Sequence, residues 1–276
     1  MNGITWIASY PKSGNTWLRL FLTKLLRPEG SPLDINDVFI KNFSDRKLWD
    51  EALGWESSDF SHQAISRMRL TVQELIAQQL GERYFKTHDA FIDAETSLEL
   101  FSNTVHSRAI YIVRNPLDVA ISLANHISQP IDLVISRMND RHGRFGDSDR
   151  GATLQIMQSL GDWSWHVRSW TEQRSMRVLI VRFEDMLEKP NATFTSVADF
   201  LDLKCNEEQI LDAVGATKFE LLQTQEIETG FREKPKDCQR FFNHGRAGRW
   251  KEILSSSQAQ AITHTHDNMM RRQGYA

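Results

Sequence analysis

The segment YPKSGNTW, residues 10–17, brings a lysine, a glycine and two hydroxyl side chains together directly after the apolar run ITWIAS. Between a strand and a helix, such a loop surrounds an anion with backbone N–H groups and the helix N-terminus. Lys12 supplies positive charge, and Ser13 or Thr16 supplies a hydroxyl donor. The usual ATP-binding order, G-x-x-x-x-G-K-[ST], places lysine after the second glycine. Here Lys12 precedes Gly14, so the segment predicts a phosphate-binding loop of a different type.

A second candidate anion site lies in VRNPLDVAISLANH, residues 113–126. Arg114 follows a predicted strand, and Ser122 lies about two turns inside the helix that follows. A planar guanidinium and a hydroxyl in this arrangement can hold a phosphate. The alternative for Arg114 is an ordinary surface charge at a strand end.

Lys86 and His88 lie in FKTHDAF, residues 85–91, at the end of another predicted strand. Their side chains point to the same side, because side chains alternate along a strand. An unperturbed histidine, with a pKa of about 6.5, suits proton removal near neutral pH. His88 is therefore a candidate general base, and a purely structural histidine is the alternative.

Four short runs rich in β-branched and aromatic residues predict buried strands, and segments with helical spacing of apolar residues separate them. This alternation indicates an α/β fold with a mostly parallel central sheet flanked by helices. Ligands of such sheets bind beyond the carboxyl ends of the strands, which is where the polar residues above are expected. The predicted strands are 4–10, 83–88, 108–114 and 177–185, and the predicted helices are 16–26, 71–80, 116–127, 153–173, 190–202 and 255–272.

Length and composition favour one domain without a nucleic-acid partner. A chain of 276 residues, 40% of them apolar, can bury a full core. A net charge of −3 gives no sign of the strongly basic surface that nucleic-acid binders carry. Cys205 and Cys238 lack the spacing of a disulfide framework or a thiolate metal site. Because no secretory signal or membrane span is recognisable, we expect a cytoplasmic protein.

Together and in this order, the three polar segments resemble the sulfotransferases that use 3′-phosphoadenosine 5′-phosphosulfate (PAPS). FEDMLEKP, residues 183–190, and FFNHGRAGRW, residues 241–250, resemble two later segments of that family. The opening of the chain and NHGRAGRW are most similar to bacterial members, among them enzymes that sulfate glycopeptide antibiotics. The resemblance implies one sulfotransferase domain over residues 1–276, with a P-loop-like loop for the phosphosulfate.

The resemblance also implies a mechanism without a metal ion. His88 deprotonates an acceptor hydroxyl, which attacks sulfur in line and expels adenosine 3′,5′-bisphosphate (PAP), while Lys12 and Lys86 stabilise the developing charge. The acceptor is a small molecule with a hydroxyl group, with a natural product or a carbohydrate favoured. A phenol, a sugar, a lipid head group and a peptide-antibiotic side chain all stay open. The donor-binding residues implied by the resemblance are Lys12, Ser13, Gly14, Asn15, Thr16, Trp17, Arg114, Ser122, Phe183, Thr217, Phe219, Asn243, His244 and Gly245.

The sequence departs from the family pattern near its end. Eukaryotic cytosolic members carry R-K-G-x-x-G, whose arginine and lysine grip the 3′-phosphate, but Asn243 and His244 stand at those positions. Arg246 or Arg249 is a candidate to replace that grip. The short dimerisation motif of many animal members is not visible, so a homodimer stays an open alternative.

Several aromatic residues allow two interpretations. Phe183 and Phe219 suit either adenine contact or core packing, and Trp49 or Trp55 is a further candidate for stacking on the base. Trp163 and His166 are candidates for lining an acceptor pocket under the segment 136–151. Acceptor-binding loops are expected at 28–66, 90–103 and 128–152, and 136–151 and 223–249 are expected to be surface loops.

Two other functions are compatible with parts of the sequence. A P-loop kinase or related NTPase is supported by the phosphate loop and by Glu184 and Asp185, which end a predicted strand where such enzymes hold Mg²⁺. The lysine-first order counts against it. The other alternative is a nucleotide-binding module that has lost catalysis or serves as a partner protein.

Overall fold

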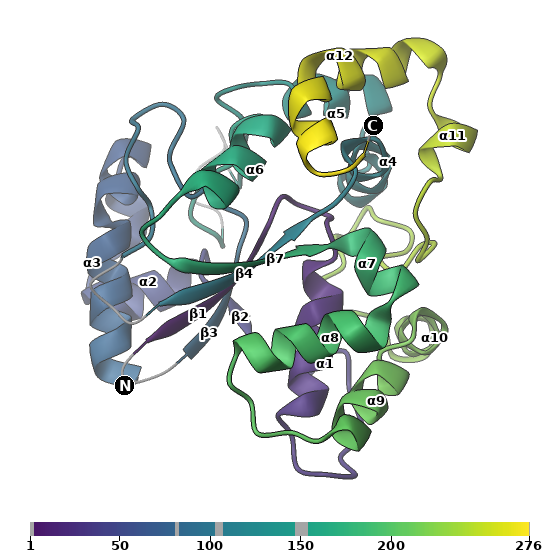
Figure 1. Ribbon diagram of the computed structural model, residues 1–276. Helices are drawn as coiled ribbons and strands as arrows, with labels where there is room; N and C mark the ends of the chain where they lie inside the picture. The colour runs from purple at the N-terminus through teal and green to yellow at the C-terminus, as the bar shows by residue number, and fades with distance from the viewer. Residues whose placement is uncertain (1–2, 81–82, 103–106, 147–153, 276) are drawn as a thin grey trace.

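The protein is built around a five-stranded parallel sheet (Figure 1). The computed structural model describes residues 3–80, 83–102, 107–146 and 154–275. Its strands follow the order β2 (Lys41–Asn42), β3 (Arg83–Thr87), β1 (Ile4–Ser9), β4 (Arg108–Val113) and β7 (Arg177–Arg182). Every pair is parallel. The expected single α/β domain with a mostly parallel sheet is confirmed.

The register of the strands brings their polar carboxyl ends together. Ile7 of β1 pairs with Lys86 of β3, and Ser9 pairs with Ile112 of β4. The loop that follows β1, the residues after β3 and Arg114 after β4 therefore leave the sheet at one edge.

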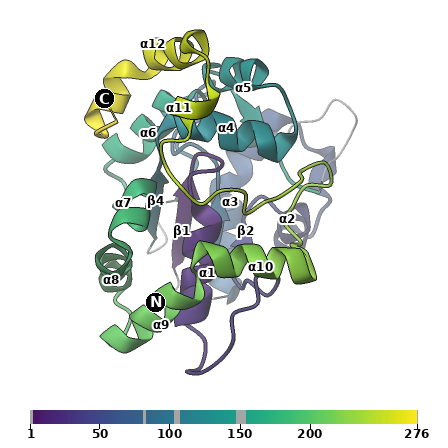
Figure 2. The ribbon, with the colours of Figure 1, turned by 90° about the vertical axis from the view of Figure 1, so that its right-hand side faces the viewer.

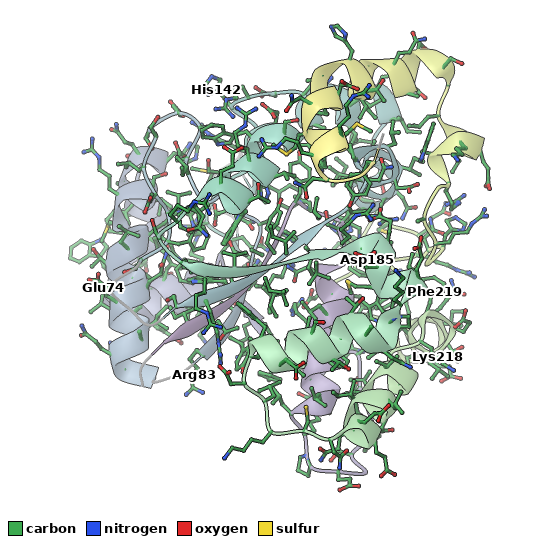
Figure 3. All side chains as sticks on the ribbon, in the orientation of Figure 1. Glu74, Arg83, His142, Asp185, Lys218 and Phe219 are labelled. Atoms are coloured by element: carbon green, nitrogen blue, oxygen red, sulfur yellow. The ribbon has the colours of Figure 1, made fainter. Side chains whose placement is uncertain are left out.

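Alternate side chains of the central strands pack into two separate hydrophobic cores, one on each face of the sheet, because side chains alternate along a strand. On one face, Trp6 and Tyr111 pack with helices α3 (His62–Leu80), α4 (Pro116–Ile127), α6 (Trp163–Glu172) and α12 (Ser256–Arg272). On the other, Ile7 and Ile110 pack with α1 (Asn15–Leu25), α7 (Phe183–Glu188), α8 (Pro190–Phe200) and α9 (Glu207–Ala216). Figures 1 and 2 show these helices on opposite sides of the sheet, and Figure 3 shows side chains filling the space between.

Local sequence accounts for the helix starts nearest the site. At α4, the Asn115 side chain accepts a hydrogen bond from the Leu117 amide, and Pro116 occupies the first turn. At α1, the N-cap is Gly14 in a left-handed conformation, with no side-chain cap. The free amide groups at the start of α1 are thus available to a ligand.

Three predicted boundaries were wrong. The helix expected over 153–173 covers only Trp163–Glu172, because Asp162 caps α6 and Gln158–Ser159 (β6) pairs antiparallel with Arg144–Phe145 (β5); residue 153 lies outside the described residues. The strand expected over 177–185 ends at Arg182, where α7 begins. The helix expected at 71–80 is the second half of the longer helix α3.

Strand β2 and six further helices were not predicted, and two of these helices interrupt the expected surface loops. Helix α5 enters 136–151, of which 147–151 lie outside the described residues, and α10 enters 223–249. No helix in the described part of the chain is long and apolar enough to cross a membrane. The unpredicted helices are α2 (Arg46–Leu53), the 3₁₀ helix Ser57–Asp59, α5 (Ile131–Met138), α9, α10 (Phe219–Thr229) and α11 (Trp250–Ile253).

Candidate active site

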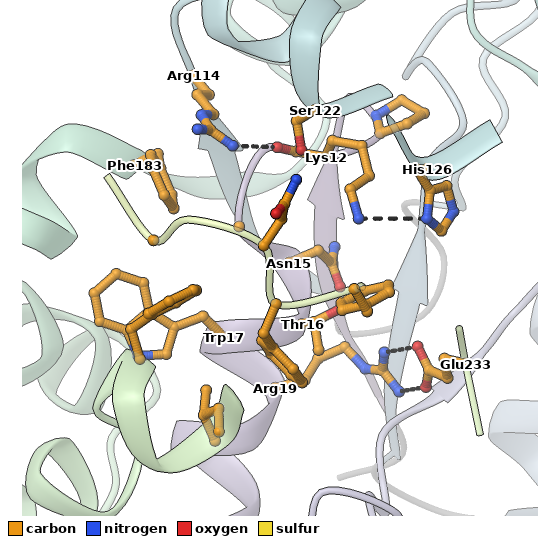
Figure 4. A pocket seen from close by; sticks show the side chains of 18 of the residues that line it. Lys12, Asn15, Thr16, Trp17, Arg19, Arg114, Ser122, His126, Phe183 and Glu233 are labelled. Atoms are coloured by element: carbon orange, nitrogen blue, oxygen red, sulfur yellow. Dashed lines mark hydrogen bonds and ion pairs between the residues drawn. The ribbon is translucent and has the colours of Figure 1, made fainter. Parts of the chain in front are cut away.

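A cavity of about 960 Å³ lies at the carboxyl edge of the sheet (Figure 4). Its walls come from the loop after β1, the ends of β2 and β3, helices α1, α4 and α7, the start of α10 and the segment 232–249. Ser13 is fully buried and is the one predicted site residue that does not line it. The predicted residues that line it are Lys12, Gly14, Asn15, Thr16, Trp17, Lys86, His88, Arg114, Ser122, Phe183, Thr217, Phe219, Asn243, His244 and Gly245.

The loop after β1 is shaped to receive an anion. Lys12 and Gly14 both have positive φ, 66° and 106°, and the Asn15 side chain fastens the loop by donating to the Ile7 carbonyl at 2.9 Å. The hydroxyl of Ser13 is buried without a hydrogen-bond partner. With the uncapped start of α1, these groups form a cradle of donors that an anion can satisfy.

Lys12 reaches into the cavity without a carboxylate partner among the described residues. Its Nζ lies 3.4 Å from Nδ1 of His126 and 3.8 Å from the ring centre of Phe241. Burial is the main cause that lowers the pKa of Lys12 to about 7; Cys238 acts in the opposite direction, and the charges of Lys86 and Arg114 add smaller lowering effects. A bound anion would reverse this shift, because it favours the charged ammonium.

His88 is held in one orientation by the strand that precedes the loop. Its Nδ1 lies 2.8 Å from the Ser9 carbonyl, so Nδ1 carries the proton and donates it. The side chain is 9% exposed, and burial, followed by the charge of Lys86, lowers its pKa well below the ordinary value. The ring is therefore neutral near pH 7, with Nε2 able to accept a proton.

Lys86 lies in an ion-pair network that the sequence did not predict. Its Nζ is 3.9 Å from Oε2 of Glu233, which accepts two hydrogen bonds from Arg19 at 2.7 and 2.9 Å (Figure 4). Burial lowers the pKa of Lys86 to about 8, while Glu233 acts in the opposite direction. Glu233 comes from the segment 223–249, whose sequence has no apolar periodicity that could have indicated its place.

Arg114 and Ser122, the second predicted anion-binding pair, line the cavity next to the loop after β1. Arg114 donates to the Lys12 carbonyl at 2.9 Å and lies 4.1 Å from the ring centre of Phe183. Its Nε is buried without a partner. Ser122 lines the same cavity, so a guanidinium and a hydroxyl are both available to a second anion here.

Aromatic rings also line the cavity. Trp17 packs edge-on against Phe183, with ring centres 6.2 Å apart. A Cβ added to Gly245 would lie 2.3 Å from the Phe219 ring, so only glycine lets that ring sit where it does. Thr217 lines the cavity, but its hydroxyl already donates to the Ala213 carbonyl.

Two sequence-based alternatives for the tryptophans were wrong. Trp49 is fully buried, with its Nε1 donating to the Phe43 carbonyl, and Trp55 is 65% exposed away from the cavity lining. Trp163 and His166 are fully buried in the core and do not line an acceptor pocket. These aromatic segments are too short for their periodicity to predict which residues face the core and which face a ligand.

The two candidate replacements for the missing basic pair differ. Arg246 is bound to Glu252 at 2.7 Å. Arg249 lines the cavity with a buried Nε that has no partner, and the amides on either side of it donate to Asp118 of α4. Arg249 thus has no ion-pair partner among the described residues, in contrast to Arg246, and its segment is fastened to Asp118, one helical turn before Ser122.

Glu184, the candidate magnesium ligand of a kinase, has other partners. It accepts hydrogen bonds from the Asn115 amide at 3.1 Å and from the Tyr275 hydroxyl at 2.9 Å. Across the described ranges, no group of three His, Cys, Asp or Glu side chains is placed to hold a metal ion. Of the features that supported the kinase alternative, the strand-end carboxylate Glu184 is thus already engaged by the protein itself.

The sequence pattern of the sulfotransferase domain matches residues 3–274. The chain belongs to the sulfotransferase family. Sulfotransferase 2A6 of Rattus norvegicus is 24% identical over 93% of this chain and 80% of its own length. The 3-alpha-hydroxysteroid sulfotransferase of Cavia porcellus is 25% identical over 95% and 82%. The expected family is confirmed, while the likeness to bacterial members stays a prediction.

Solved structures of sulfotransferases share the fold of this one. Mouse sulfotransferase SULT7A1 complexed with PAP aligns over 98% of this chain and 85% of its own, with 18% identity and a TM-score of 0.62. Retinol dehydratase in complex with androsterone and PAP aligns over 97% and 80%, with 16% identity and a TM-score of 0.63. The chain is therefore a sulfotransferase by family and by fold.

Proposed function

We propose that this sulfotransferase transfers the sulfuryl group of PAPS to the hydroxyl of a small polar acceptor, with His88 as general base. The observation that carries the proposal is the tautomer of His88, whose Nδ1 is committed to Ser9. Its Nε2 is left to accept a proton in the same cavity as Lys86 and the anion-binding loop.

PAPS, the sulfuryl donor, has phosphate groups that could bind the buried polar groups without partners at this cavity. The loop after β1 and Lys12 would hold the 5′-phosphosulfate, and Arg114 with Ser122 would hold the 3′-phosphate. Two anion-binding groups in a cavity that aromatic rings also line suit a nucleotide with phosphate groups on both its 3′ and its 5′ oxygen. The unpartnered Ser13 hydroxyl and Arg114 Nε support this assignment, because buried donors are rarely left unsatisfied.

The reaction then balances with residues of this chain alone. The acceptor proton passes to Nε2 of His88, the acceptor oxygen bonds to sulfur, and the bond from sulfur to the bridging oxygen breaks, leaving PAP with the electron pair. Lys86 and Lys12 stabilise the negative charge that grows on the sulfuryl and bridging oxygens. No step requires a metal ion.

We place the acceptor near Lys86 and His88, where several polar side chains line the cavity. Asn42 pairs in register with Lys86 at the sheet edge, and Lys41, Asp45 and Gln155 line the same wall. Phe145 adds one aromatic ring to this wall. These residues fall in the expected acceptor segments 28–66 and 128–152 or directly after them. Such a wall favours an acceptor with several polar groups, a carbohydrate or a polar natural product, over a bare apolar ring.

Calorimetric titration tests the donor assignment. PAP should bind tightly with or without Mg²⁺, and adenosine 5′-monophosphate and ATP should bind more weakly. Transfer of labelled sulfate from PAPS to phenol and to methyl glucoside then tests the reaction. ATP binding that requires Mg²⁺, with no binding of PAP, would return the kinase alternative to first place. PAP binding without any transfer would favour a nucleotide-binding module.

A further inference from the structure

The tryptophan-rich helix α6 contacts the backbone that carries His88. Nε2 of His166 lies 3.1 Å from the His88 carbonyl. Trp170, one turn later, donates from Nε1 to the Asp89 carbonyl at 2.9 Å. Ser169 accepts a hydrogen bond from the Phe91 amide at 2.9 Å. One face of α6 thus binds three backbone groups within the segment 88–91, just beyond the last residue of β3.

His166 is itself fixed by its surroundings. The Tyr111 hydroxyl lies 2.9 Å from its Nδ1, and the Tyr10 ring packs edge-on against it, with ring centres 5.3 Å apart. The side chain is fully buried, and burial lowers its pKa to about 3. The ring is therefore neutral: Tyr111 donates to Nδ1, and the proton on Nε2 is donated to His88.

The Asp89 side chain fastens the same segment from the other side. It accepts from Arg69 at 2.7 Å and from the Ser159 amide at 2.8 Å. Arg69 and Asp89 are both buried, with 1% and 0% of their side chains exposed. The segment around His88 is thus bound by side chains from α3 and α6, and the Ala90 amide also donates to the Ser159 carbonyl of β6 at 2.7 Å.

We propose that α6 is a positioning element for catalysis, in which His166 holds the peptide of His88 and so sets the direction of its Nε2. The inference rests on the proposed function, since it assumes that His88 is the base. His166 itself does not line the cavity, so it acts only through His88. Helix α6 would thus orient the base, a role distinct from both acceptor binding and core packing.

A double-mutant cycle separates this role from plain structural support. His166→Leu should lower single-turnover transfer from labelled PAPS at least tenfold, because small displacements of a catalytic group cost about 10²-fold. The acceptor is phenol or methyl glucoside, whichever reacts faster. PAP affinity should not change, and His166→Gln, which keeps an N–H donor, should recover part of the rate. In a His88→Ala background, His166→Leu should have no further effect.

His266→Leu is the matched control. His266 is also a buried histidine against α6, where its Nδ1 lies 2.8 Å from the Ser164 hydroxyl, and it has no recorded contact with residues 88–91. Its replacement should loosen α6 without slowing transfer tenfold. If His166→Leu does not fold, Ser169→Ala, which removes the acceptor of the Phe91 amide, should show the same non-additivity on a smaller scale.

Nitrogen NMR of the imidazoles gives a second measurement that needs no acceptor. In the wild type, His88 should stay neutral with its proton on Nδ1 between pH 6 and 8, and His166→Leu should change this tautomer pattern. Equal rate losses in the wild-type and His88→Ala backgrounds, or unchanged His88 signals in His166→Leu, would overturn the inference. If His88→Ala itself reacts at the wild-type rate, the proposed base is wrong instead.

Discussion

Arg19 and Glu233, 214 residues apart in the sequence, form a two-point ion pair at the floor of the cavity. Arg19 is almost fully buried and also donates to the Ile40 carbonyl. Glu233 therefore has two tasks: it neutralises a buried guanidinium, and it lies next to Lys86.

Replacing Glu233 with glutamine should change the pH dependence of transfer. The carboxylate raises the pKa of Lys86, which burial has lowered to about 8, so its loss should lower that pKa further. Because the proposed mechanism needs Lys86 in its protonated form, the fall in rate on the alkaline side should move to lower pH. A profile of kcat from pH 6 to 9 checks this. Glu228→Gln, on the exposed surface of α10, is the control. If the alkaline fall in kcat of Glu233→Gln stays at the wild-type pH, Glu233 does not control the protonation of Lys86.

PAP binding should take up a proton near pH 8. Free Lys12 has a pKa of about 7, and the bound phosphates should raise it, so affinity should fall as the pH rises above about 7. Calorimetry in two buffers of different ionisation enthalpy measures the proton uptake. Lys12→Met should abolish it, and a wild-type protein that binds PAP without proton exchange at pH 8 would contradict the assignment.

His88→Ala should lower kcat by about 10² to 10⁴, the range for a positioned acid–base group. PAP affinity should remain close to that of the wild type, because His88 contacts the acceptor side. Single-turnover rates and calorimetry separate the two effects. Since the pKa of His88 lies well below its ordinary value, the wild-type rate should show no loss between pH 7 and 6. A loss of rate between pH 7 and 6 would indicate that a residue other than His88 is the base.

Arg114→Ala should weaken PAP about 10- to 100-fold, as expected for one lost charge-assisted contact. Adenosine 5′-monophosphate, which lacks the 3′-phosphate, should lose much less affinity. Calorimetric titration of both nucleotides gives the ratio. Arg271→Ala, on an exposed face of α12, serves as the control, and an equal loss for both nucleotides would place Arg114 elsewhere on the donor.

Gly245→Ala should impair nucleotide binding through Phe219. The added methyl would lie 2.3 Å from that ring, and Gly245 has φ of 59°. Gly248 is the matched control, since its φ is 79° but no atom lies within 4 Å of the added methyl. Both alanine variants should lose about 1 kcal/mol of stability from backbone strain, measured by denaturant unfolding. Only Gly245→Ala should also weaken adenosine 5′-monophosphate, so equal affinities for the two variants would remove Phe219 from the adenine wall.

Residues close to strand ends could be placed from the sequence. Lys12, His88 and Arg114 follow strands with clear apolar runs, and parallel pairing brings such ends together. Glu233 could not be placed, because its position depends on a partner 214 residues away in a segment without periodicity. The prediction that His166 lines an acceptor pocket was wrong for another reason. The sequence does not distinguish a buried histidine that binds a backbone carbonyl and a hydroxyl from a histidine that faces a ligand.

The bond from Nδ1 of His88 to the Ser9 carbonyl joins the base to the strand that leads directly into the anion-binding loop. The proposed proton acceptor and the proposed binding loop for the sulfuryl donor are therefore linked through β1, and their relative position is set by the fold. The distance between Nε2 of His88 and the sulfur of a bound donor would then be fixed, which leaves a gap of constant size between them. Acceptors would be sorted by whether a hydroxyl can enter that gap while the rest of the molecule meets the polar wall.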